Sequence, residues 1–146
     1  MFAFERSIWV NRTQQEVWDY LSEPTNDPKW RGSAVSAEWI SSPPYGVGST
    51  YRSVDKLMGR NIDGTQVVTA WDVPDLYCFK SGSGPLSFEF TATLVSKDNG
   101  TQLTFSGQAE LAGVFKIAER LAGKQMEKQI AADMDGFKRV MEGGTK

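Results

Sequence analysis

Apolar and polar residues alternate along much of the chain between residues 33 and 109, which is typical of strands with one buried face. In the cleanest segment, Leu86, Phe88 and Phe90 fall on one face and polar residues fall on the other. Alternation and turn residues together predict a first strand at 2–10 and further strands near 33–40, 49–58, 62–73, 76–82, 86–97 and 101–109.

Turn residues separate these segments. Asn99-Gly100 lies between two alternating runs and predicts a β-hairpin. Asp63-Gly64 competes with Gly59 for the preceding hairpin turn, so that boundary stays open. The other predicted turns are Pro43-Pro44-Tyr45-Gly46, Pro74 and Gly82-Ser83-Gly84-Pro85.

Helical spacing appears in two places outside the β-rich region. Thr13-Gln14-Gln15-Glu16 matches a capping box, and the short helix that follows ends near Pro24. Residues 23–30 predict a turn or a second short helix. Residues 112–142 predict one long amphipathic helix with its apolar face formed by Val114, Phe115, Ala118, Leu121, Ala122, Ile130, Met134, Phe137 and Met141.

This order predicts an α+β fold: a seven-stranded antiparallel sheet, short helices after the first strand, and one long C-terminal helix. The sheet must curve around the helix to bury its apolar face. A curved sheet and a straight helix cannot touch everywhere, so the space between them is the candidate site for a ligand.

The length, net charge and composition of the chain limit its possible functions. The length of 146 residues fits a single domain, 1–146, and a formal charge of −2 lacks the basic character of a nucleic-acid-binding protein. Neither a long apolar run nor a secretory signal is visible, so we expect a cytoplasmic protein without stable membrane insertion. The aromatic share of 12% fits a cavity lined by rings.

Histidine is absent, and Cys78 is the one cysteine. This excludes histidine-based catalytic triads and histidine-ligated zinc, and we expect neither a metal nor a cofactor. The apolar neighbours of Cys78 predict a buried thiol. Any chemistry must therefore use carboxylates, Tyr, Lys, Arg or bound water.

Several short motifs, in this order, carry a resemblance to a known family: VWDYL (17–21), PKW (28–30), VGSTY (47–51), VTAWDVP (68–74), GTQLT (100–104) and FKRVME (137–142). With the order of elements, they resemble the helix-grip, or START-like, superfamily and in it the polyketide cyclase/dehydrase and lipid-transport family. The resemblance covers nearly the whole chain and implies a helix-grip fold with a cavity between the sheet and the last helix.

The resemblance implies a small hydrophobic ligand, such as a lipid, a polyketide or an aromatic metabolite. A carrier or sensor is the favoured function, because no catalytic constellation is visible. The alternatives are a polyketide cyclase/dehydrase-type enzyme using the same cavity and a protein-interaction module with a vestigial cavity. We expect a monomer or a homodimer.

Candidate ligand contacts are inward-facing residues and aromatic residues on less regular segments. A Tyr51 or Tyr77 hydroxyl could donate a hydrogen bond to a ligand carbonyl, and Asp55 could hold a catalytic water. Arg52 and Asp55 should lie on opposite faces of their strand, so one of them could reach the cavity. The predicted ligand-binding residues are Trp30, Tyr51, Trp71, Tyr77, Phe79, Phe88, Phe90, Phe105, Phe115, Ala118 and Met134.

Overall fold

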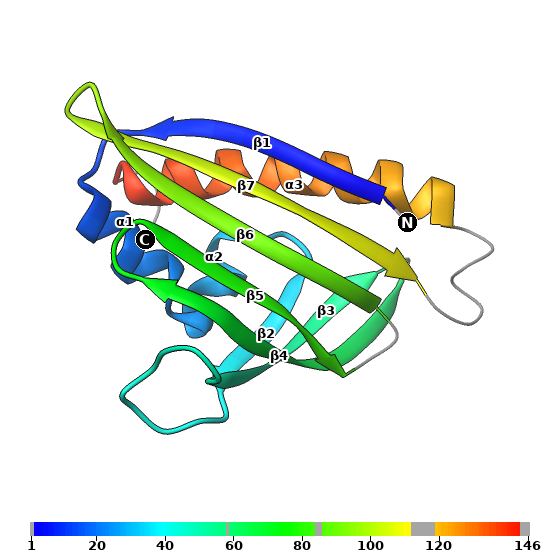
Figure 1. Cartoon of the computed structure of the whole chain (residues 1–146). Helices are drawn as coiled ribbons and strands as arrows, with labels where there is room; N and C mark the ends of the chain where they lie inside the picture. The colour runs from blue at the N-terminus through cyan, green and yellow to red at the C-terminus, as the bar shows by residue number, and fades with distance from the viewer. Residues whose placement is uncertain (1, 58, 84–85, 112–118, 144–146) are drawn as a thin grey trace.

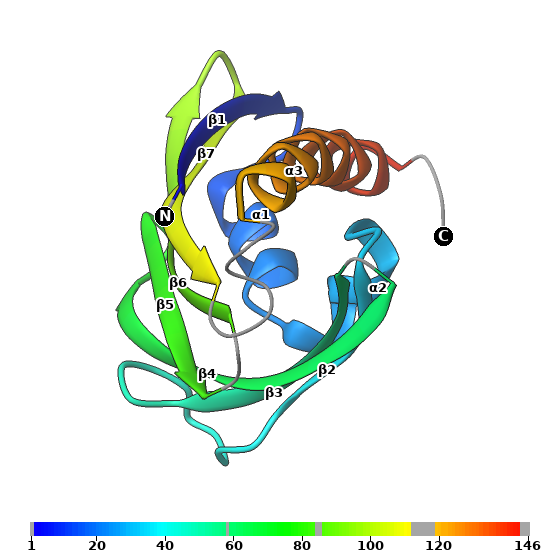
Figure 2. The ribbon, with the colours of Figure 1, turned by 90° about the vertical axis from the view of Figure 1, so that its right-hand side faces the viewer.

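One antiparallel sheet of seven strands curls around a long helix in the computed structural model, which describes residues 2–57, 59–83, 86–111 and 119–143 (Figures 1 and 2). The strand order is β1-β7-β6-β5-β4-β3-β2, so consecutive strands from β2 to β7 are neighbours and β1 closes on β7. This confirms the predicted α+β helix-grip fold. The strands are β1 (Phe2–Val10), β2 (Ala34–Trp39), β3 (Thr50–Leu57), β4 (Arg60–Asp72), β5 (Leu76–Ser83), β6 (Leu86–Lys97) and β7 (Gly100–Leu111).

Short helices follow the first strand, as predicted. Helix α1 (Gln14–Leu21) begins with the predicted capping box: the Glu16 amide donates to Thr13 Oγ1 at 3.2 Å, and the Thr13 amide donates to Glu16 Oε1 at 3.0 Å. A 3-10 turn, η1 (Pro24–Asn26), and the four-residue α2 (Asp27–Trp30) follow. The short helical segments η1 and α2 therefore connect α1 to β2.

The structure settles the turn positions of the β3–β4 and β6–β7 hairpins. Gly59, with φ 80°, lies between β3 and β4, whereas Gly64 pairs with Ser53 inside the β3–β4 ladder, so Asp63-Gly64 is not the turn. In the β6–β7 hairpin, Asp98 and Asn99 hold the two positive φ angles, 51° and 64°, and Gly100 is already the first residue of β7. The predicted turn was therefore displaced by one residue.

Helix α3 (Glu119–Met141) packs against β1 and α2. Phe137 is fully buried, and its ring centroid lies 5.1 Å from that of Trp30 and 5.9 Å from that of Tyr20. The predicted start of this helix, residues 112–118, lies outside the described residues. Because α3 is held at the β1 side and by α2, it lies away from the inner surface of β3 to β5 (Figure 2).

Cys78 is half-buried, so the prediction of a buried thiol was wrong. Its neighbours Tyr77 and Phe79 point inward and line the cavity described below. Alternation then directs Cys78 to the outer face, where its Sγ donates to Thr91 Oγ1 at 3.4 Å. The apolar residues beside it in the sequence belong to the other face of the sheet.

Gly107 sits in the middle of β7 between two aromatic residues of the adjoining strands. Its register partners are Phe4 on β1 and Phe90 on β6, and their ring centroids are 6.3 Å apart. A Cβ at Gly107 would collide with the Glu89 carbonyl oxygen and lie 3.1 Å from Phe4 Cζ. The missing side chain thus lets the two rings approach across β7.

Replacing Gly107 with Ala should lower the free energy of unfolding by about 2 kcal/mol, the usual scale of an overpacked core position. The opposing atom belongs to the backbone, so a strand must shift to relieve the contact. Urea unfolding measures the loss, and Gly46→Ala is the matched control because a Cβ there meets nothing within 4 Å. Equal stability of the two variants would contradict the proposed close packing.

Candidate ligand-binding cavity

A cavity of about 500 Å³ lies between the curved sheet, α2 and α3. Its wall includes residues of β1, β3 to β7, η1, α2 and α3. This volume lies within the range of sites for small organic molecules. The space that the fold predicts between helix and sheet is therefore present.

One side of the cavity is an aromatic wall, which we define as Phe79, Phe88, Phe90 and Phe105. The rings of Phe79 and Phe90 stack with centroids 4.8 Å apart, and Phe105 lies 4.9 Å from Phe90. These side chains come from the inward positions of β5, β6 and β7, so the alternation along these strands builds the wall. It offers an apolar surface to the body of a ligand.

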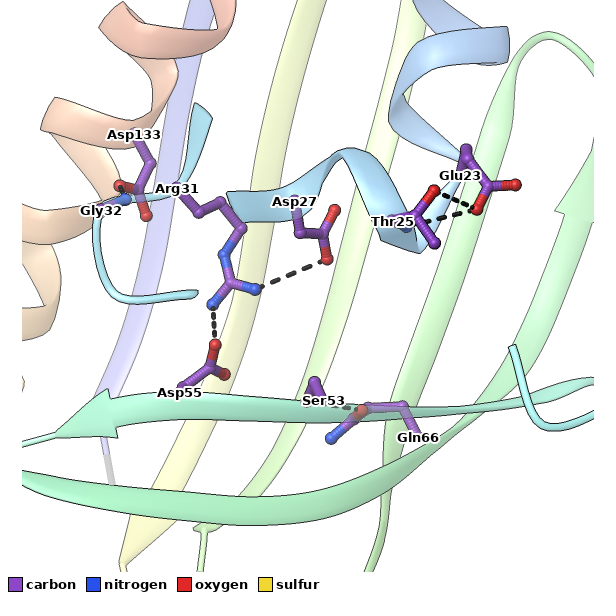
Figure 3. Close-up of polar contacts among 9 residues, drawn as sticks. All are labelled: Glu23, Thr25, Asp27, Arg31, Gly32, Ser53, Asp55, Gln66 and Asp133. Carbon is purple, nitrogen blue, oxygen red and sulfur yellow. Dashed lines mark hydrogen bonds and ion pairs between the residues drawn. The ribbon is translucent and has the colours of Figure 1, made fainter. Parts of the chain in front are cut away.

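The opposite side carries a charged cluster, which we define as Asp27, Arg31, Asp55 and Asp133 (Figure 3). Arg31 follows the last residue of α2, and its guanidinium lies 3.1 Å from Asp55 Oδ1 and 3.6 Å from Asp27 Oδ2. The Arg31 side chain keeps 24% of its surface accessible because it lines the cavity rather than the packed core. One cation thus bridges α2 and β3.

Asp133 brings α3 into the charged cluster. Its Oδ1 accepts a hydrogen bond from the Gly32 amide at 2.9 Å and one from Gln129 Nε2 at 2.7 Å. Nearby on the sheet, the buried Ser53 hydroxyl donates to Gln66 Oε1 at 2.9 Å (Figure 3). The polar side of the cavity is therefore tied to three elements, α3, β3 and β4.

Burial changes the acid–base properties of the charged cluster. Desolvation raises the pKa of Asp27 to about 7, since Arg31 only partly offsets the burial and the nearby charges of Asp55 and Glu23 add to the shift. Desolvation also raises the pKa of Asp133, against the opposing effect of its bond from Gly32. Burial by itself would lower the pKa of Arg31, but the carboxylates around the guanidinium outweigh that effect and raise it.

Tyr51 on β3 and Tyr77 on β5 are buried residues of the cavity wall. Desolvation raises the pKa of both hydroxyls, so both stay neutral near pH 7 and can act as hydrogen-bond donors. Within the described part of the chain, neither hydroxyl makes a hydrogen bond to another residue. They are therefore available to a ligand.

Seven of the predicted ligand-binding residues line the cavity: Trp30, Tyr51, Tyr77, Phe79, Phe88, Phe90 and Phe105. Trp71 instead packs edge-on against Trp18, with centroids 5.2 Å apart, and Met134 lies in the hydrophobic core. Phe115 and Ala118 fall outside the described residues. Contact of any of these side chains with a ligand remains a prediction.

Arg52 and Asp55 lie on opposite faces of β3. Arg52 is exposed and makes a two-pronged ion pair with Asp63, at 2.9 Å and 2.5 Å. Asp55 lines the cavity and pairs with Arg31. Of Arg52 and Asp55, the carboxylate is therefore the one that reaches the cavity.

The sequence interpretation missed Asp27, Arg31 and Asp133. Asp27 is the first residue of a four-residue helix and Arg31 directly follows the last, and a helix of this length is too short to show a periodic pattern. Asp133 did leave a signal, because it interrupts the apolar face of α3 next to Met134 and is itself buried. A buried carboxylate on such a face indicates a partner or a polar cavity.

Two kinds of feature are absent from the described residues. No group of three or more His, Cys, Asp or Glu side chains there could hold a metal ion. No helix in those parts of the chain has the length and apolar character needed to cross a membrane.

A curved antiparallel sheet that grips a long C-terminal helix over a cavity defines the helix-grip class of proteins. A family model described as polyketide cyclase / dehydrase and lipid transport matches residues 1–142. The chain belongs to this family. No match was found among curated proteins.

Solved structures share the fold at low sequence identity. The TTHA0849 protein of Thermus thermophilus is 16% identical with a TM-score of 0.84, and the comparison covers 99% of this chain and 100% of that one. A conserved protein from Geobacillus kaustophilus is 23% identical with a TM-score of 0.76, covering 97% and 95%. The di-domain ARO/CYC BexL from the BE-7585A biosynthetic pathway is 14% identical with a TM-score of 0.76, covering 97% of this chain and 50% of BexL.

Proposed function

We propose that the protein binds one small, largely apolar molecule in this cavity and acts as its carrier or sensor, with residues 1–146 forming a single domain. The observation that carries the proposal is the cavity itself, whose aromatic wall faces a compact charged cluster. Such a site buries the apolar body of a ligand and orients its polar end. Membership of a family described by polyketide chemistry and lipid transport supports the same class of ligand.

A cyclase or dehydrase acting in the same cavity is the second candidate. Asp27, with a pKa of about 7, can give or take a proton near neutral pH, and the neutral Tyr51 and Tyr77 hydroxyls can donate to a carbonyl. The name of BexL, a di-domain ARO/CYC, supports this candidate. Mass spectrometry of a bound compound before and after incubation separates the two, since an enzyme changes its mass or isomeric form and a carrier does not.

The remaining rival is a protein-interaction module with a vestigial cavity. A cavity of about 500 Å³ favours ligand binding over that function. We further propose a cytoplasmic protein that acts as a monomer or a homodimer.

The proposal is tested with a neutral probe, 2-(1-naphthyl)ethanol, titrated into the protein in a calorimeter. Binding of one molecule per chain is expected, with the naphthalene ring against the aromatic wall. Met126, on the cavity side of α3, supplies the test variant. Met126→Trp should weaken binding about tenfold or more, since losing 1.4 kcal/mol of contact is sufficient for that change.

Lys128→Trp is the matched control, because it adds the same ring at an exposed position of α3. It should bind the probe as the wild type does. Absence of binding by the wild-type protein, or equal binding by all three proteins, would contradict binding inside the cavity.

A further inference from the structure

The charges around the cavity are unbalanced. Three carboxylates of the lining (Asp27, Asp55 and Asp133) surround one guanidinium (Arg31), which gives 1 − 3 = −2 when all four groups are ionised. A ligand entering the cavity therefore meets a negative polar side.

Arg31 is already engaged and offers little to an anion. Its Nη2 donates to Asp55 Oδ1 at 3.1 Å, and its Nη1 lies 3.6 Å from Asp27 Oδ2. A ligand carboxylate or phosphate at this position would have to displace one of these carboxylates or lie beside both. Both arrangements place like charges together at a partly desolvated site.

Asp27 retains free acceptor capacity. The residue is only 8% exposed, lines the cavity, and pairs with Arg31 through Oδ2 at 3.6 Å. Within the described part of the chain, its Oδ1 accepts no hydrogen bond (Figure 3). A buried carboxylate can accept several hydrogen bonds, and a cationic donor is its strongest partner.

Building on the proposed function, we infer that the ligand is an amphiphile with a cationic amine head, which donates to Asp27 while its apolar body lies against the aromatic wall. The amine supplies the positive charge that the lining lacks. Ser53, Gln66 and Gln129 provide further polar groups around the head, and the two tyrosine hydroxyls can serve as acceptors as well as donors.

Binding of an amine should depend on pH. Asp27 accepts an ammonium group best when ionised, and it loses its proton around pH 7. The charged or titratable groups around it are Tyr20 on α1, Glu23 before η1, Arg31 after α2, Asp55 and Tyr51 on β3, Tyr77 on β5 and Asp133 on α3. Affinity for an alkylamine, which remains protonated over this range, should rise between pH 6 and pH 8.

Three probes with the same ring system test the inference by calorimetry at pH 8 and low salt: 2-(1-naphthyl)ethylamine, 2-(1-naphthyl)ethanol and 1-naphthylacetic acid. Their heads are a cation, a neutral donor and an anion. The amine should bind about tenfold more tightly than the alcohol, which corresponds to the added strength of a charge-assisted hydrogen bond, and the acid should bind most weakly.

Asp27→Asn should remove the preference for the amine, so that the amine and the alcohol bind the variant with similar affinity. Asp63→Asn is the matched control, because Asp63 is also paired with an arginine but lies on the outer face. It should keep the preference of the wild type.

The outcomes separate this inference from the proposed function. Equal or tighter binding of the alcohol or the acid would overturn the amine head and leave the cavity proposal intact. An amine preference that survives in Asp27→Asn would overturn the role of Asp27. Failure of all three probes to bind would overturn both proposals.

Discussion

Replacing Asp27 with Asn is expected to raise the free energy of unfolding at pH 8 by as much as about 4 kcal/mol, at 1.36 kcal/mol for each pKa unit. The reason is that folding raises the pKa of this carboxyl from 3.8 to about 7, mainly by burying it. Ionised Asp27 therefore lowers the free energy of unfolding at pH 8. Asparagine keeps the shape and an acceptor for Arg31 but carries no charge.

The sign of the pH dependence follows from the raised pKa. Below pH 4, Asp27 is protonated in both the folded and the unfolded state, and it imposes no penalty. Between pH 4 and pH 7 the unfolded chain releases the proton while the folded chain retains it, so stability falls as pH rises. The advantage of Asp27→Asn should accordingly grow over this interval and level off above pH 7.

Urea unfolding of the wild type and Asp27→Asn at several pH values between 4 and 8 measures this difference. Asp63→Asn is the control with the opposite sign, since Arg52 holds the pKa of Asp63 below its usual range. That variant should be slightly less stable than the wild type by the same amount throughout pH 4 to 8, because the contribution of Asp63 is lost only when the pH falls below 3.8. A lower stability of Asp27→Asn at pH 8 would mean that the ion pair with Arg31 outweighs the cost of burial.

Removing Arg31 should have the opposite effect. Arg31→Met keeps much of the aliphatic stem but leaves Asp27, Asp55 and Asp133 without their shared cation, and we expect a loss of about 3 kcal/mol at pH 8. The loss arises from buried carboxylates that repel one another. It should shrink at pH 5, because Asp27 and Asp133, whose pKa values are raised, then take up protons more readily.

Two further variants test this explanation. Arg31→Met combined with Asp27→Asn should recover much of the stability lost in the single Arg31 variant, because one of the uncompensated charges is gone. Arg52→Met removes the exposed ion pair with Asp63 and should change stability little. If the double variant is no more stable than Arg31→Met alone, the loss comes from packing rather than from charge.

Strand alternation was sufficient to predict the fold and the aromatic wall. Phe79, Phe88 and Phe90 occupy alternating positions of β5 and β6, and such positions point to one side whatever the details of the curvature. The long helix was predicted from apolar residues that recur at helical spacing. What alternation could not show is that part of this inner face borders empty space rather than packed core.

Of the charged cluster, the sequence indicated only Asp55 as a candidate, for two physical reasons. Tyr51, Ser53 and Asp55 occupy alternate positions on the inner face of β3. Because Ser53 and Asp55 are polar, the sequence of this strand shows no clear alternation of apolar and polar residues. Asp27 begins the short helix α2 and Arg31 follows its end, and the position of this segment depends on contacts with β3 and α3, which are distant in the sequence. Polar residues on a buried face thus mark the cavity, although local patterns cannot identify their partners.

Native mass spectrometry of the protein purified gently from its own host tests the central claim most directly, with Met126→Trp purified in parallel. We expect a wild-type mass increased by one small apolar compound per chain, and loss of that compound from the variant whose cavity is partly filled. A clean apo mass for the wild type, together with no rise in melting temperature across lipids and aromatic compounds with cationic, neutral and anionic heads, would contradict ligand binding in the cavity.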